Sequence, residues 1–127
     1  MGAGVKPAIT PVKWHDAEDI RWAVRHWAAR IGVKAPQVHL QRMHRKWASV
    51  STAGRLTLNL ELLDLPRELG DFVIVHELVH LLAPNHGKVF KSFMYAYMPD
   101  WEERERQLQP QGTPHGVRRA TGRAVGQ

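Results

Sequence analysis

Apolar residues at helical spacing mark a first helix near the start of the chain. Asp16 precedes this run as an N-cap, Asp19 follows three residues later as an approximate capping box, and Gly32 is a typical C-terminal stop. The apolar positions that share one helical face are Ile20, Val24, Trp27 and Ile31. Steps of three and four residues place these side chains together. We therefore predict an amphipathic helix that serves as scaffold.

After Pro36, apolar residues recur at every second position, a spacing that is typical of strands. Alternation of apolar and polar residues covers residues 38–41, 47–51 and 55–60. Ala53 and Gly54 separate the last two runs and favour a hairpin. The sequence therefore predicts a small sheet, antiparallel in at least this part, that lies between helices. The segment before the first helix is expected to be extended, with an edge strand near Lys13.

A second helix follows Pro66, a residue that the first turn of a helix tolerates. Its apolar residues are Leu69, Phe72, Val73, Val75, Leu78, Val79 and Leu82. Because they cover most sides, we expect the helix to be buried and to end near Ala83, just before Pro84. Polar residues interrupt its apolar run, which is also too short to span a bilayer.

Helical spacing returns from Val89 to Tyr97 and ends at Pro99, and residues 101–107 predict a last short helix. Residues 109–127 are rich in Gly, Pro, Gln and Arg, so we expect a disordered basic tail after a single domain over residues 1–108. The predicted fold class is α+β, zincin-like: a small antiparallel-containing sheet, an N-terminal helix, a buried active-site helix and C-terminal helices.

The composition of the chain limits the kinds of metal site, partner and location that we expect. The chain has 127 residues, a net charge of +6 and no cysteine, which rules out disulfides and thiolate metal sites. The tail carries three arginines and no acid, so half of the net charge belongs to it and a nucleic-acid partner is only weakly indicated. Without cysteine or an apolar stretch typical of a secretory signal near Met1, we expect a cytoplasmic protein and no membrane association.

The segment His76-Glu77-Leu78-Val79-His80 predicts a zinc site. Residues four apart on a helix share a face, so the imidazoles of His76 and His80 can reach one ion. Glu77 lies on the adjoining part of that face, where a carboxylate can act as the catalytic base. Two histidines and a glutamate within an apolar helix would otherwise be costly to bury.

A catalytic zinc site needs a third protein ligand, and His86 is the candidate. It follows the turn that Pro84 imposes, so the chain can fold back toward the ion. The alternative is a loop histidine that bonds a helix end, with a carboxylate from elsewhere as the third ligand.

The remaining chemistry-bearing residues are weaker candidates. The other histidines considered, His15, His39, His44 and His115, are expected to be surface or locally bonded side chains, and Met94 and Met98 to fill the core. Tyr95 and Tyr97 could place a phenol near a developing oxyanion, but core packing is favoured for both.

Residues 46–108 resemble the YgjP-like and WLM-like zinc metallopeptidases, a group related to SprT-like and other HExxH peptidases. The motifs that carry this resemblance are residues 47–50, 54–59, 71–81, 85–87, Phe90 and 99–101. The resemblance implies a compact metallopeptidase domain with His76, His80 and His86 as zinc ligands and Glu77 as base. The family often has Gly and Cys where this chain has Ala48 and Val50. Metzincins share the histidine spacing but have Gly where Ala83 stands, so the chain is not placed with them.

The predicted activity is zinc-dependent hydrolysis of a peptide bond in a peptide or protein substrate, with Glu77 moving the proton of the attacking water. Three alternatives stay open at this point. They are a SprT-like protease associated with DNA, a zinc-binding module without catalysis, and another hydrolase chemistry at the same site.

Overall fold

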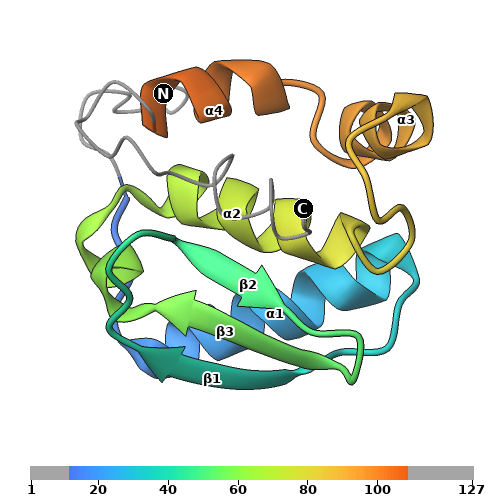
Figure 1. Ribbon diagram of the computed structural model, residues 1–127. Coiled ribbons are helices and arrows are strands. Elements are labelled where there is room, and N and C mark those ends of the chain that lie inside the picture. The colour runs from blue at the N-terminus through green and yellow to red at the C-terminus, as the bar shows by residue number, and fades with distance from the viewer. Residues whose placement is uncertain (1–11, 109–127) are drawn as a thin grey trace.

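The computed structural model describes residues 12–108, and within them four α-helices pack with a small sheet (Figure 1). The elements in chain order are α1 (Ala17–Ile31), β1 (Gln37–Gln41), β2 (Ala48–Val50), β3 (Arg55–Asn59), the 3-10 helix η2 (Leu60–Asp64), α2 (Arg67–Val79), α3 (Lys88–Tyr97) and α4 (Trp101–Leu108). Helix α2 occupies the middle, with α1 and the sheet on one side and α3 and α4 on the other. The predicted α+β class is confirmed, whereas the tail beyond residue 108 lies outside the described residues.

Helix α1 has the predicted ends. The carboxylate of Asp16 accepts a hydrogen bond from the Asp19 backbone N–H at 3.0 Å, which caps the first turn. Gly32 ends the helix in the left-handed region at φ 88°, where its N–H donates to Ala28. The buried face contains Ile20, Val24 and Ile31, as the helical period predicts.

The sheet is mixed, with strand order β1-β3-β2. Strands β2 and β3 form the predicted antiparallel hairpin, and Gly54 takes a positive φ of 92° in its turn. Strand β1 pairs with β3 in parallel, an arrangement that the sequence alone did not reveal. The alternating side chains Leu56 and Leu58 of the central strand are fully buried. The edge strand expected near Lys13 is reduced, among the described residues, to an isolated antiparallel bridge between Lys13 and Pro66.

Asn59 organises the chain where β3 ends, a feature that the strand pattern did not predict. Its side-chain amide donates to the carbonyls of Met43 and Lys46 at 3.0 and 2.8 Å, and its oxygen accepts from the Glu61 N–H. The residue is only 3% exposed. One buried amide therefore closes the long β1–β2 connection and caps η2, which leads the chain into α2.

Helix α2 is buried almost throughout, as its apolar composition predicts. Its α-helical part ends at Val79 rather than near Ala83, so the predicted end is four residues too late. From His80 to Leu82 each backbone N–H bonds the carbonyl three residues earlier, so the last turn is tightened. Ala83 then turns the chain away ahead of Pro84.

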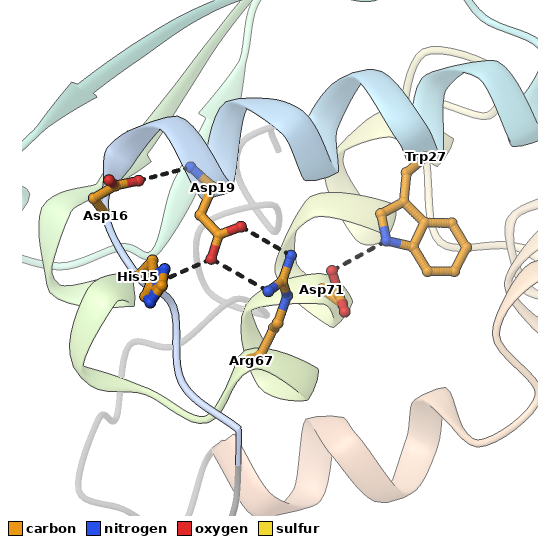
Figure 2. Close-up of polar contacts among 6 residues, drawn as sticks. All are labelled: His15, Asp16, Asp19, Trp27, Arg67 and Asp71. Atoms are coloured by element: carbon orange, nitrogen blue, oxygen red, sulfur yellow. Dashed lines mark hydrogen bonds and ion pairs between the residues drawn. The ribbon is translucent and has the colours of Figure 1, made fainter.

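Two polar contacts fix α2 along α1 (Figure 2). The guanidinium of Arg67 donates to both carboxylate oxygens of Asp19 at 3.2 Å. A hydrogen bond from the His15 backbone, together with Arg67, keeps the pKa of Asp19 below its ordinary value. Further along, the Trp27 indole N–H donates to the Asp71 carboxylate at 3.1 Å, while burial raises the pKa of Asp71. Both contacts lie in the first turns of α2, so they fix the amino-terminal part of this helix against α1.

Helices α3 and α4 match the predicted last helices and cover the opposite side of α2. Phe90, Met94, Trp101 and Leu108 are their buried anchors. The Arg104 side chain ties α4 to its own start at Asp100 and to the Glu68 carbonyl on α2. None of the described helices is long and apolar enough to cross a membrane, and the cytoplasmic location stays a prediction.

Gly70 provides a test of how closely α2 is packed. A Cβ at this position would lie 2.5 Å from the indole of Trp14, which is buried and covered by the Arg67 guanidinium. We expect Gly70→Ala to lower the free energy of unfolding by about 1–2 kcal/mol, because overpacking outweighs the gain of about 1 kcal/mol in helix propensity. Urea unfolding measures this change. In a Trp14→Leu background the same substitution should instead stabilise the protein, and an unchanged penalty there would contradict the proposed clash.

Candidate metal centre

Three imidazoles meet at the carboxyl end of α2. His76 lies in the last full turns of the helix, His80 is its C-cap, and His86 reaches back from the loop that precedes α3. One ring nitrogen from each of them lies within 4.8 Å of the other two. The structure therefore brings together the three histidines that the sequence selected, in the fold-back geometry expected for His86.

The spacing of the nitrogens suits a shared metal ion. The Nε2 atoms of His80 and His86 are 3.0 Å apart. Two imidazole nitrogens on one tetrahedral zinc ion would lie about 3.3 Å apart, since each Zn–N bond is about 2.0–2.1 Å long. Two lone pairs at this distance repel each other unless a proton or a cation lies between them. The donor set thus fits a metal ion without rearrangement of the backbone.

The tightened end of α2 orients His80. Its Nδ1 lies 3.2 Å from the Ala83 carbonyl oxygen, which can only accept a hydrogen bond. Nδ1 must therefore carry the proton of the neutral ring, and Nε2 keeps its lone pair directed toward His86. A backbone carbonyl behind a ligating histidine is a common way to fix the tautomer and the ring orientation.

Phe90 forms the floor of the cluster. Its ring centroid lies 5.2, 4.8 and 4.7 Å from those of His76, His80 and His86, and the side chain is only 2% exposed. An aromatic ring in contact with all three imidazoles restricts their rotation and keeps water away from one side of the site.

Burial also keeps the imidazoles neutral. Loss of solvent lowers the pKa of His76 to about 3. Burial, followed by the proximity of His76, lowers the pKa of His80 and of His86 to about 4, and Lys91 contributes at His86. All three rings are therefore unprotonated at neutral pH, which is the form that binds metal ions.

Glu77 is buried beside the cluster at 1% exposure, with its carboxylate Oε2 3.5 Å from His76 Nδ1. That Nδ1 atom is itself buried and has no hydrogen-bond partner within residues 12–108. Glu77 lies outside the group of converging nitrogens. The arrangement thus places a carboxylate next to the three donors, where it can exchange a proton with a group bound at the site.

The secondary candidates are distributed differently. His15, His39 and His44 are exposed, in keeping with the surface role predicted for them, and His115 lies outside the described residues. Met94 and Met98 are buried in the core as expected. The hydroxyl of Tyr97 donates to the Ile31 carbonyl at 3.4 Å, which agrees with packing. Tyr95 is 46% exposed, so the prediction of core packing was wrong for this residue, whose ring instead lies against Trp101.

A cavity of about 270 Å³ adjoins the histidines on the side of α4. Its lining residues are His76, His86, Phe90, Lys91, Trp101, Glu102 and Glu105. The charged members of this set were not selected from the sequence, because nothing in their spacing links α4 to the histidine motif. The only signal was the segment Pro99-Asp100-Trp101, which carried part of the family resemblance.

The buried neutral histidines predict a pH-dependent stability for the metal-free protein. His76 has a pKa of about 3 when folded, whereas an unfolded histidine has a pKa near 6.5. Below pH 6.5 the unfolded chain therefore takes up a proton that the folded chain does not, and His76 alone should lower the free energy of unfolding by about 2 kcal/mol at pH 5. Urea unfolding with a chelator present, at pH 7 and pH 5, tests this. His76→Leu should reduce the difference, His39→Gln should not, and an equal slope in His76→Leu would refute the assignment.

Comparison with known proteins agrees with this geometry. The fold is similar to that of two solved metallopeptidase zymogens. Abylysin of Pyrococcus abyssi matches with a TM-score of 0.69 and 23% identity, over 77% of this chain and 98% of abylysin. Jannalysin of Methanocaldococcus jannaschii matches with a TM-score of 0.66 and 24% identity, over 72% of this chain and 95% of jannalysin. No curated protein matches the sequence. Residues 11–111 match the YgjP-like metallopeptidase domain, a span that also includes the first helix. The chain therefore belongs to the YgjP-like metallopeptidases.

Proposed function

We propose that this metallopeptidase uses zinc, held by His76, His80 and His86, and that Glu77 is its catalytic base. The observation that carries the proposal is the convergence of three neutral imidazoles beside a buried carboxylate. A ligand set of three nitrogens and no thiolate is typical of catalytic zinc, and it leaves a coordination position open. Such an ion makes water a nucleophile near neutral pH and polarises a carbonyl group.

Each residue has a separate task in this proposal. Ala83 fixes the His80 ring through its carbonyl, and Phe90 holds all three rings from one side. Glu77 accepts a proton from the attacking water and then delivers it to the leaving amine, which requires the carboxylate to be near the reacting atoms and shielded from bulk solvent. Its rigid helical support keeps it in place throughout.

Strand β2 offers a place for the substrate. It is an edge of the sheet and lies beside α2, the helix that contains His76 (Figure 1). An extended peptide can add to a free strand edge through backbone hydrogen bonds, which bind main chain without regard to sequence. We infer that the scissile bond is presented to the site in this way.

Zinc binding should depend on the proposed ligands. Wild-type protein is expected to hold one zinc ion per chain. His80→Ala or His86→Ala should weaken zinc affinity by more than about 100-fold, because mutation of residues that only support the ligands already weakens metal affinity by about 10–100-fold. Elemental analysis and competition with a zinc indicator measure this. His39→Ala, at an exposed histidine of β1, is the matched control. Undiminished affinity in His86→Ala would remove it from the ligand set.

Hydrolysis should depend on Glu77 separately from zinc. Glu77→Gln keeps the size of the side chain but cannot accept a proton, so kcat should fall by about 10²–10⁴-fold while the zinc content stays unchanged. Turnover of a mixed peptide library provides the measurement. Glu103→Gln, on the exposed side of α4, should retain wild-type turnover. Retained turnover in Glu77→Gln would show that another group is the base.

A further inference from the structure

The proposed hydrolysis alone does not explain which side chains line the cavity beside the histidines. It is bordered by His76 and His86, so a group that fills it lies next to the reacting atoms. Its volume of about 270 Å³ is below the usual size of a pocket for a whole small-molecule ligand. That volume is suited to one side chain of a bound peptide.

The inner wall of the cavity is aromatic. Phe90 and Trp101 are 2% and 6% exposed, so their rings form a fixed apolar surface. The Trp101 indole nitrogen is buried and has no hydrogen-bond acceptor among the described residues. This nitrogen is enclosed by the protein, so Trp101 borders the cavity with the apolar part of its ring.

The rim of the cavity is predominantly acidic. Glu102 and Glu105 come from one helical face of α4, three residues apart, and Glu105 is half-buried. The neighbouring Glu102 raises the pKa of Tyr95, whose ring lies edge-on against that of Trp101. Among the described residues that line the cavity, Lys91 is the one cationic side chain, and it is exposed. Two carboxylates and one ammonium group thus border the cavity.

We propose that this cavity is a specificity subsite for an arginine or lysine side chain of the peptide substrate, an inference that rests on the proposed function. The aliphatic stem would lie along Phe90 and Trp101, and the cationic head would lie at Glu102 and Glu105. Long basic side chains favour this combination of an apolar wall and a charged rim, and a cation beside an indole ring gains further attraction.

Binding of matched peptides tests the subsite without relying on turnover. The probe is a set of fluorescent peptides, acetylated and amidated at their ends, in which one arginine is moved through each position and compared with citrulline, its neutral isostere. Fluorescence polarisation with zinc-loaded Glu77→Gln protein should show, at one position, arginine binding about fivefold more tightly than citrulline. The advantage should shrink as salt is raised.

Variants of α4 assign the effect to the cavity. Glu102→Gln combined with Glu105→Gln should abolish the arginine advantage, whereas Glu103→Gln, which lies outside the cavity and pairs with Arg106, should preserve it. Absence of an arginine advantage at every position, including absence of any binding, overturns the proposal, as does an advantage that survives in the double variant. Preference for an unblocked citrulline peptide over its acetylated form would indicate a site for a free amino terminus instead.

The two proposals fail in different ways. If Glu77 is not the base, the Glu77→Gln protein turns over a peptide without arginine, while the arginine-to-citrulline ratio of affinities is unaffected. If the subsite is wrong, that ratio is one, while the loss of turnover in Glu77→Gln is still observed.

Discussion

The burial of α2 is the constraint on which the rest of this protein depends. The helix is surrounded by α1, the sheet, α3 and α4, and its buried residues include a histidine and a glutamate. Polar groups in such a place destabilise the fold unless they are bonded or bind an ion. The packing that makes the helix rigid is therefore also what makes His76 neutral and Glu77 shielded, so the stability of the core and the chemistry of the site have the same origin.

The end of α2 converts this rigidity into a binding geometry. If the α-helix continued to Ala83, the carbonyl of that residue would be directed along the helix axis. Because the last turn tightens, the carbonyl instead meets His80 Nδ1, and the chain that follows can return His86 to within 3.0 Å of the His80 ring. Phe90, in the first turn of α3, then packs against all three rings. A few backbone hydrogen bonds thus decide where the donors converge.

Helix α4 has a comparable double role. Trp101 and Leu108 close the core against α2, and Arg104 anchors the helix to the Glu68 carbonyl. Residues on the same helix, Glu102 and Glu105, border the cavity next to His76. A helix held this firmly keeps these two carboxylates in a fixed position relative to the histidine cluster.

Local patterns in the sequence were sufficient for the first helix with its caps, the β2–β3 hairpin and the histidine pair, because capping, the turn at Gly54 and the four-residue spacing involve near neighbours. They also indicated His86 as the third donor, since Pro84 had to turn the chain. Other features needed the tertiary structure: the parallel pairing of β1 with β3, the buried amide of Asn59, the exposure of Tyr95 and the acidic cavity that α4 forms with His76. Each of these depends on contacts between segments far apart in the sequence, and neither periodicity nor local turn chemistry carries information about which distant surfaces meet.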